Sequence, residues 1–208
     1  MKIRKFFLTA LILTFSFVLC SCGSSKTEKK EERMIYDIED VSSDGDVKHT
    51  AVKFETDGMG EFTAELYPEY APQTVSAFLK LVSDGFYDGA SFEKVFTGRY
   101  ILSSEKGAAS SKDGNLKIYG EFYKNGVSNS MPMEKGTLVM YHPEDDYNGG
   151  VSQFMIMLSD VKDMEGTYAP FAKITSGIEV AEKIASAALN DENELVSPIV
   201  MKKVSVVE

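Results

Sequence analysis

The chain has 208 residues and a formal net charge of −10 at pH 7, and 43% of its residues are hydrophobic. An acidic surface repels the phosphates of nucleic acids, so we expect no nucleic-acid partner. The two cysteines, Cys20 and Cys22, both lie near the N-terminus, which excludes a thiol nucleophile, a disulfide and a cysteine-based metal site from the remainder of the chain.

Residues 1–21 have the pattern of a secretory signal peptide. Three basic residues, Lys2, Arg4 and Lys5, precede an apolar run over residues 6–19. This run is shorter than the roughly 20 apolar residues that a membrane-spanning helix needs. Removal of the segment would take away three positive charges and change the net charge from −10 to about −13.

The apolar run ends in Leu19-Cys20-Ser21-Cys22, which resembles the lipobox of bacterial lipoproteins. Cys22 fits the lipidated position better than Cys20, because Ser21 precedes it and Leu19 lies three positions before it. The resemblance implies a lipid anchor on Cys22 and a location at the extracytoplasmic side of the cell membrane. A plain signal peptide with incidental cysteines is the alternative.

Residues 22–47 are rich in charge and poor in large apolar residues, so we predict a flexible polar tether there. A short group of apolar residues (Met34, Ile35, Tyr36 and Ile38) interrupts this pattern and could dock on the folded part. The remaining residues, 48–208, have the size of one domain and contain no internal repeat. We expect this domain to be a monomer.

The first elements of the domain are a hairpin and a helix. Residues 51–66 alternate around the turn residues 57–60, and their period predicts two paired strands. Pro72 suits a first helical turn, and Val75, Phe78, Leu79 and Val82 then follow helical spacing. Gly85 is placed to end this helix.

Later segments have mostly strand character. We predict strands over 91–102, 137–141, 153–158, 170–175 and 198–207, a loop over 105–115, and a second helix over 177–188. Many short strands with one early and one late helix indicate a closed barrel whose ends are covered by the helices.

The segment SFEKVF at 91–96 raises a question about Lys94. Alternation along a strand would place Phe92, Lys94 and Phe96 on one face. Lys94 is then either a working cation in an apolar groove or a surface lysine whose stem covers hydrophobic residues.

Several blocks together resemble the cyclophilins, a family of peptidyl-prolyl cis-trans isomerases. The blocks are residues 60–92, IYGEF at 118–122, KGTLVM at 135–140, VSQFMI at 151–156 and residues 165–184, in the family's order and approximate spacing. The resemblance implies a mainly β fold: a closed eight-stranded barrel capped by two α-helices.

Prolyl isomerisation crosses a barrier of roughly 18–20 kcal/mol without making or breaking a bond to hydrogen. It needs neither a nucleophile nor a general base, and we expect no cofactor and no metal. It benefits from a dry pocket for the proline ring, donors for the flanking carbonyl, and a cation near the prolyl nitrogen, whose lone pair localises when the bond twists.

The resemblance implies that Lys94 is the catalytic group, because the family's Phe-His-Arg motif reads Phe92-Glu93-Lys94 here. Lysine is not equivalent to arginine, since a hydrated point charge replaces a planar fork of donors. The positions that the resemblance assigns to substrate binding are Phe92, Arg99, Tyr100, Tyr141, Gln153, Met155, Met164 and Tyr168.

Most of these positions differ from the family's residues. In this chain Arg99-Tyr100 replace the family's Phe-Met, Leu102 replaces its Gln, and Met155 replaces its pocket Phe. Tyr141-His142 replace the family's Ala-Asn, Met164 replaces its Leu, and Tyr168 replaces its His. Asp163 aligns near a position where the family has an aromatic residue. Gln153 is retained, although it could instead satisfy a loop backbone. His142 with the acidic residues 144–146 superficially suggests a metal site but is more typical of a solvated turn.

The sequence therefore predicts prolyl isomerisation of secreted or envelope proteins, with weak turnover because the motif is degenerate. Its partners would be proline-containing segments of extracytoplasmic polypeptides. The alternative is a non-catalytic module that kept the barrel and binds proteins or peptides at the cell surface.

Overall fold

The computed structural model describes residues 33–34, 48–104 and 116–207, which all belong to one compact unit, residues 31–208. The predicted signal peptide, Cys22, nearly all of the predicted tether and the predicted loop at 105–115 lie outside the described residues. None of the helices in the described ranges has the length and apolar character that a membrane span would require.

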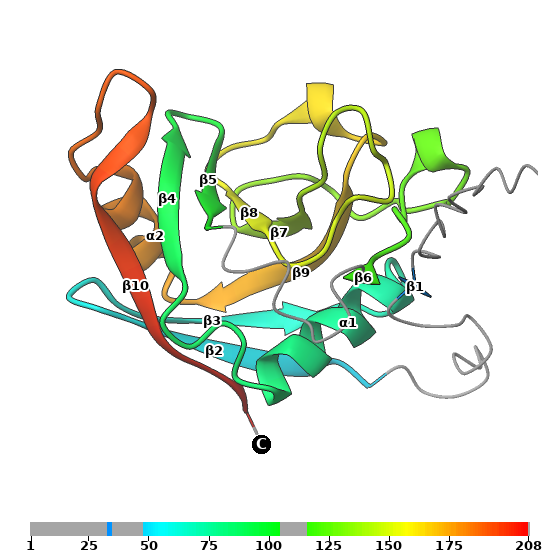
Figure 1. The fold of residues 1–208 in the computed structure, drawn as a ribbon, viewed down its shortest axis with the longest axis horizontal. Helices are drawn as coiled ribbons and strands as arrows, with labels where there is room; N and C mark the ends of the chain where they lie inside the picture. Colours follow the sequence, from blue (N-terminus) through cyan, green and yellow to red (C-terminus); the bar gives the residue numbers. More distant parts are fainter. Residues whose placement is uncertain (1–32, 35–47, 105–115, 208) are drawn as a thin grey trace, which may run out of the picture. The chain divides into compact units, whose positions relative to one another are not determined.

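Eight strands form a closed antiparallel barrel in the order β10-β2-β3-β9-β7-β8-β5-β4 (Figure 1). The strands are β2 (Thr50–Thr56), β3 (Gly60–Leu66), β4 (Ser91–Phe96), β5 (Tyr100–Ser103), β7 (Thr137–Met140), β8 (Phe154–Met157), β9 (Ala169–Ser176) and β10 (Glu194–Val207). Two further strands, β1 (Arg33–Met34) and β6 (Leu116–Lys117), pair in parallel as a separate sheet. The predicted mainly β fold, a closed eight-stranded barrel with two helices, is confirmed.

The β2–β3 hairpin forms as its alternation predicts. Thr50 pairs with Leu66 and Thr56 with Gly60, so the two strands are in register along their whole length. Phe62, Ala64 and Leu66 are all buried, while the residues between them are partly exposed. Period-2 patterning thus selects the face that packs into the barrel.

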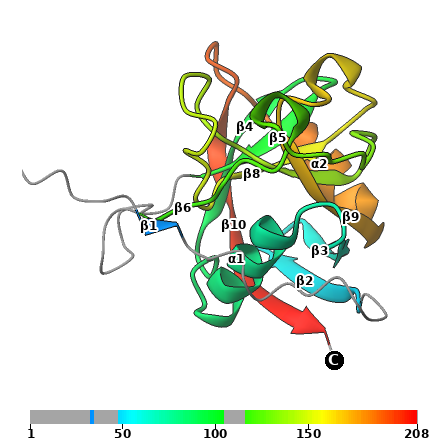
Figure 2. The ribbon, with the colours of Figure 1, turned by 90° about the vertical axis from the view of Figure 1, so that its right-hand side faces the viewer.

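Helix α1 (Pro72–Ser83) packs against β9 and β10 and lies at the lower end of the barrel in both ribbon views (Figures 1 and 2). Its Phe78 is fully buried, with its ring centroid 5.0 Å from that of Phe171 and 5.9 Å from that of Phe154. Gly85 follows the helix with φ +67°, in the left-handed region expected of a helix stop.

Glu121 caps the start of α1 from a distant part of the chain. The residue at the N-cap position, Ala71, has no side-chain acceptor. The backbone N–H groups of Gln73 and Thr74 instead donate to the Glu121 carboxylate, at 3.0 and 2.8 Å, and the Thr74 hydroxyl adds a third bond at 2.7 Å. The carboxylate also sits at the positive end of the helix dipole, which favours a negative charge.

Helix α2 (Ile178–Ala185) packs against β3 and β5 and is shorter than predicted. It ends at Ala185, because the chain then turns to form the bridge between Leu189 and Leu195, and Ala188 is exposed. Gly177 precedes α2 with φ +80°, and a Cβ atom there would lie only 2.4 Å from the carbonyl oxygen of Glu61. Only glycine fits this close approach.

Two other details differ from the sequence prediction. The continuous strand predicted over 91–102 is divided into β4 and β5 by a turn that contains Gly98 at φ +70°. Strand β10 begins earlier than predicted, at Glu194, and its pairing with β4 shifts register between Glu194 and Ile199. Pro198 lies in this irregular stretch, where a missing N–H breaks no ladder bond.

Candidate active site

Strand β4 places Lys94 on the outside of the barrel by means of a β-bulge. Phe92 pairs with Ser103, and Lys94 pairs with Leu102. The step from the first pair to the second therefore spans two residues on β4 but only one on β5. A bulge breaks the two-residue alternation. The prediction that Phe92, Lys94 and Phe96 share one face is therefore wrong: Phe92 is fully buried, whereas Lys94 and Phe96 are partly exposed.

Phe92 belongs to the barrel core. Its ring packs edge-on against Phe154, with 6.1 Å between the centroids. With no exposed surface, it can influence a ligand only through the residues that cover it. Its predicted contact with a substrate has no counterpart in this geometry.

The outward-facing side chains of β5, β7 and β8 form a second apolar group, separate from the barrel core. The inward residues along β8 are Phe154 and Ile156, and the outward ones are Met155 and Met157, yet all four are buried. We call this group the outer cluster; it comprises Leu102, Met133, Val139, Met155, Met157, Val161 and Met164, with Tyr100, Tyr141 and Tyr168 packed on it and partly exposed. Burial on both sides explains why β7 and β8 read as continuous apolar runs.

Five of the predicted substrate-binding residues thus come together in one place: Tyr100, Tyr141, Met155, Met164 and Tyr168. Their accessibility differs. Met155 is 0% exposed and Met164 7%, so these two side chains fill the interior of the cluster. The apolar surface offered to a ligand is supplied mainly by the three tyrosine rings.

The tyrosines also bring hydroxyl donors to this surface. Tyr141 and Tyr168 stack with 6.4 Å between ring centroids. Burial raises the pKa of both Tyr100 and Tyr168, and neighbouring phenols add to the effect. Both hydroxyls therefore keep their protons at neutral pH, as a donor to a peptide carbonyl must.

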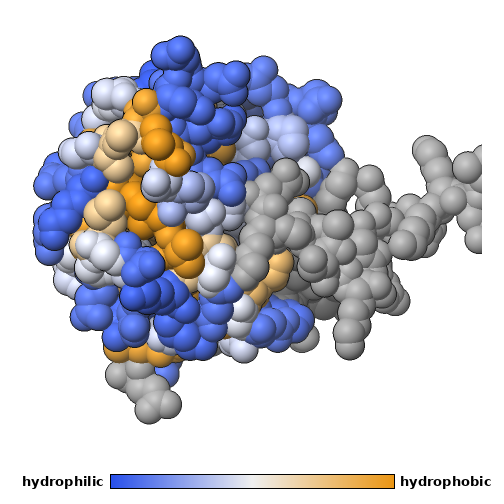
Figure 3. Space-filling model, turned by 60° about the vertical axis from the view of Figure 1, so that its left-hand side comes forward, coloured by the Kyte–Doolittle hydropathy of each residue, from blue (hydrophilic) through white to orange (hydrophobic). Residues whose placement is uncertain are grey.

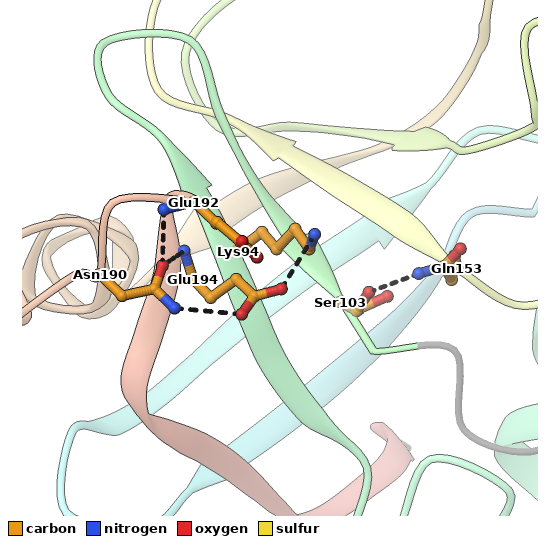
Figure 4. A network of polar contacts seen from close by, with 6 residues as sticks. All are labelled: Lys94, Ser103, Gln153, Asn190, Glu192 and Glu194. Atoms are coloured by element: carbon orange, nitrogen blue, oxygen red, sulfur yellow. Dashed lines mark hydrogen bonds and ion pairs between the residues drawn. The ribbon is translucent and has the colours of Figure 1, made fainter.

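Lys94 has a fixed partner. Its Nζ lies 3.1 Å from Oε1 of Glu194 on β10, and both side chains are 40% exposed (Figure 4). Hydrogen bonds from Asn190 first and Lys94 second lower the pKa of the Glu194 carboxyl. The side chain is thus solvent-accessible on the outer face of β4, where Leu102 of the outer cluster is its register partner, but the ammonium is not an isolated charge.

Arg99 and Asp163 stand on two neighbouring loops and pair with each other, with 2.7 Å between Nη2 and Oδ2. Arg99 lies in the turn between β4 and β5, and Asp163 lies in the short helix η4 (Lys162–Met164). The hydrogen bond from Arg99 lowers the pKa of Asp163. Arg99 therefore contributes to the rim near Met164 as half of an ion pair.

Gln153 makes the backbone contact that the sequence analysis left open. Its Nε2 donates to the carbonyl oxygen of Ser103 at 3.0 Å (Figure 4), while the Ser103 hydroxyl accepts from the N–H of Phe154 at 2.9 Å. These two bonds hold the end of β5 against the start of β8. Gln153 therefore has a structural role in this conformation, whatever it contacts in addition.

His142 is buried and turned away from the acidic residues that follow it. Nδ1 lies 2.7 Å from the carbonyl oxygen of Pro143 and Nε2 2.8 Å from that of Thr167. The ring lies between Phe122 and Tyr168, with centroid distances of 5.0 and 4.5 Å. Both ring nitrogens of His142 already face backbone oxygens, and its ring packs against that of Tyr168, so His142 has a structural role. No group of metal-ligating side chains is found among the described residues.

Sequence reasoning missed two polar residues that matter here, Glu194 and Asn190. Both belong to the acidic stretch NDENE at 190–194, which looks like any solvated loop. Their role becomes visible only in the structure, where β10 starts at Glu194 and closes the barrel against β4. That pairing is a long-range contact, and the local pattern does not encode it.

A cavity of about 310 Å³ lies elsewhere, between the β2–β3 turn, the segment after α2 and the irregular part of β10. It is lined by Asp57, Met59, Ala187, Ala188, Val196, Ser197, Pro198, Ile199 and Val200. Figure 3 turns this side of the molecule forward and shows apolar residues gathered in a strip bordered by hydrophilic ones. None of the predicted site residues lines this cavity.

The closed barrel, its two helices and a cation on the outer face of β4 beside an aromatic-rimmed cluster define a cyclophilin-like β-barrel protein. The chain belongs to the cyclophilin-type peptidyl-prolyl cis-trans isomerase family: the model of that family, described as cyclophilin type peptidyl-prolyl cis-trans isomerase/CLD, matches residues 51–206.

Individual relatives agree with this assignment. Over 160 residues the chain is 29% identical to peptidyl-prolyl cis-trans isomerase-like 1 of Aspergillus fumigatus, covering 76% of this chain and 96% of the relative. It is 35% identical over 128 residues to peptidyl-prolyl cis-trans isomerase B of Bacillus subtilis, covering 62% and 85%. The crystal structure of a Cryptosporidium parvum cyclophilin-type isomerase superposes with a TM-score of 0.66 at 23% identity, covering 77% of this chain and 99% of that one, which establishes the likeness of fold.

Proposed function

We propose that the protein catalyses cis-trans isomerisation of X–Pro peptide bonds at the outer cluster, with Lys94 as the electrostatic group. The observation that carries the proposal is the bulge in β4, which turns Lys94 out of the barrel, where its register partner on β5 is Leu102 of the outer cluster. Its ammonium is accessible to a bound peptide and would stabilise the localised lone pair of a twisted prolyl nitrogen.

The surrounding residues supply the other requirements of the reaction. The rings of Tyr100, Tyr141 and Tyr168 form an aromatic surface suited to a proline ring, and their hydroxyl groups are donors suited to the flanking carbonyl. Neither a nucleophile nor a proton-transfer group is required, because only rotation about the amide bond occurs.

Three features limit the turnover that we expect. Lys94 replaces a bidentate guanidinium by a point charge, and Glu194 already neutralises part of that charge. Met155 and Leu102 are buried, so their side chains occupy space that a deep proline pocket would need. We therefore propose weak catalysis.

Cis-trans exchange of a short neutral peptide with one Ala–Pro bond tests this function. The full chain, purified in a non-ionic detergent, is added in catalytic amount, and the exchange rate is measured by NMR exchange spectroscopy. The uncatalysed bond takes tens to hundreds of seconds, so even weak catalysis is detectable. An exchange rate that does not rise with protein concentration would contradict the proposal.

A non-catalytic peptide-binding module is the second candidate. The observation in its favour is the filled interior of the outer cluster together with the Arg99–Asp163 ion pair at its rim. The same NMR samples separate the two candidates, because a binding module would shift and broaden peptide resonances without accelerating exchange.

For location and substrates we propose a lipid anchor on Cys22, extracytoplasmic exposure, and proline-containing segments of secreted or envelope proteins as substrates, with the protein acting as a monomer. The support is the Leu19-Cys20-Ser21-Cys22 sequence after a short apolar run. Cys22→Ala should release the protein from membranes or leave an uncleaved precursor. A Cys22→Ala protein that is still processed and lipid-labelled would contradict the assignment, and Cys20→Ala is the matched control.

A further inference from the structure

Lys94 and Glu194 are direct neighbours across two strands. Their Cα atoms are register partners in the antiparallel pair of β4 and β10, and their charged atoms lie 3.1 Å apart. The N–H of Val95 also donates to the carbonyl oxygen of Asn193 at 2.9 Å, which ties the start of β10 to β4. The carboxylate is therefore placed beside the ammonium by the backbone, not only by its own charge.

The Glu194 carboxylate is held from its other side by Asn190. Nδ2 of Asn190 donates to Oε2 of Glu194 at 3.1 Å, while Oδ1 of Asn190 accepts from the N–H groups of Glu192 and Glu194, both at 2.9 Å (Figure 4). The loop also contains Asn193 in a left-handed conformation, φ +61°. One carboxylate oxygen faces Asn190 and the other faces Lys94, so the negative charge has a defined position before any ligand arrives.

The Glu194 carboxylate changes the charge that a peptide encounters near Lys94. A lone ammonium would attract peptides with acidic residues beside the proline. Here the ammonium is accompanied by a fixed carboxylate with an equal exposed fraction, and the chain as a whole carries a net charge of −10. An acidic residue of the peptide would be repelled by Glu194, whereas a basic one could bind to it and leave Lys94 free to approach the prolyl nitrogen.

We infer that Glu194 is a specificity-determining residue, which makes the site prefer proline-containing segments with a lysine or arginine next to the proline. The inference rests on the proposed isomerase site. Asn190 is the positioning residue for Glu194, since it fixes the carboxylate without facing Lys94.

The test compares three peptides that differ only in the residue before proline: lysine, alanine or glutamate. Exchange rate and dissociation constant are both measured by NMR with the full chain, the Glu194→Gln variant and a matched control, Glu61→Gln. Glu61 on β3 pairs with Lys53 on β2 at 3.5 Å, two strands away from β10 in the barrel, so its variant loses the same charge and also an ion pair. Glutamine at 194 can still accept the hydrogen bond from Asn190.

The parent and Glu61→Gln should prefer the lysine peptide over the glutamate peptide by roughly three- to tenfold, as expected of an exposed but fixed charge. Glu194→Gln should reduce this ratio to one or below, because it leaves the Lys94 ammonium without its carboxylate partner, and should accelerate exchange of the alanine peptide. The preference of the parent should also shrink when salt is raised from about 0.05 M to about 0.5 M.

Two results would overturn the inference, and they differ from each other. If exchange is catalysed but Glu194→Gln keeps the parent's preference, Glu194 only ties β10 to β4, and the isomerase proposal stands. If no protein accelerates exchange and none of the peptides binds, both proposals fail. A dissociation constant that depends on Glu194, without exchange, would support the selection of basic segments by a binding module.

Discussion

Arg99 and Asp163 form an ion pair, 2.7 Å between Nη2 and Oδ2, at the rim of the outer cluster. These are the positions where the cyclophilin resemblance leads us to expect a phenylalanine and an aromatic residue. The two charges satisfy each other, and both side chains remain substantially exposed, at 45% and 67%. The rim of this site is therefore polar, although its interior is apolar.

The first prediction concerns large apolar ligands of the cyclosporin type, which depend on aromatic residues in the family's groove. We expect very weak or undetectable binding by calorimetry, because such a ligand would have to cover paired charges and remove their water. The double variant Arg99→Phe with Asp163→Trp should bind measurably. Sub-micromolar binding to the parent would contradict this. The control Lys80→Phe with Asp84→Trp replaces an ion pair of similar exposure at the C-terminal end of α1.

The second prediction concerns the distant cap of α1. Glu121 is 2% exposed and accepts three hydrogen bonds from Gln73 and Thr74. Glu121→Ala should lower the free energy of unfolding by about 2–4 kcal/mol, because it leaves one buried and one partly buried helix N–H group without their carboxylate partner. Urea unfolding measures the loss. The control is Glu134→Ala, whose carboxylate is exposed and pairs with Lys173; an equal loss in both variants would show that the cap adds nothing.

These contacts show what the sequence could and could not predict. The β2–β3 hairpin and α1 follow from local periodicity, and the barrel follows from the order of elements that resembles the family. The cap of α1 by Glu121 joins residues 47 apart along the chain, and the Lys94–Glu194 pair joins residues 100 apart. Such partners are set by the closure of the barrel, so no local pattern identifies them.

The bulge in β4 marks a second limit of sequence reasoning. Phe92-Glu93-Lys94 reads as ordinary alternation, and only the pairing with Leu102 and Ser103 shows that one residue is inserted. The family resemblance nevertheless named five predicted substrate-binding residues that the structure brings together in one cluster. It could not show that Met155 is fully buried, since burial depends on the residues that pack over it.

The third prediction concerns pH. His49 lies between two carboxylates, with Nδ1 2.6 Å from Glu65 and Nε2 3.0 Å from Glu69. Partial burial alone would lower the pKa of His49, but the two carboxylates together raise it above the ordinary value of 6.5. Folding therefore strengthens proton binding. The stability that His49 contributes is complete below the unfolded pKa and is lost as pH rises through the folded pKa.

The measurement is the difference in free energy of unfolding between the parent and His49→Gln. This difference should be largest at about pH 5.5 and should shrink by about pH 8.5, above the ordinary pKa of histidine. The other histidine, His142, is present in both proteins, so its effect cancels. Replacing both Glu65 and Glu69 by glutamine should flatten the dependence; parallel pH curves for parent and His49→Gln would rule out this linkage.

The last prediction concerns Lys94. If its ammonium assists rotation about the prolyl bond, Lys94→Ala should lower the exchange rate of the neutral Ala–Pro peptide by about tenfold or more, the effect expected of one hydrogen bond from a charged group. Lys94→Arg should raise the rate modestly, since a fork of donors can bond to Glu194 and still face the substrate. Thermal stability should change little in either variant, because the pair with Glu194 is exposed.

The control is Lys53→Ala, which removes a lysine paired with Glu55 and Glu61 on the outer surface of β2. It should leave exchange unchanged. If the stem of Lys94 merely covers Leu102, alanine would cost a little stability through lost packing, and neither Lys94 variant would alter catalysis. Unchanged rates in both variants, beside measurable catalysis by the parent, would remove Lys94 from the mechanism and leave the tyrosine hydroxyls as the groups to test next.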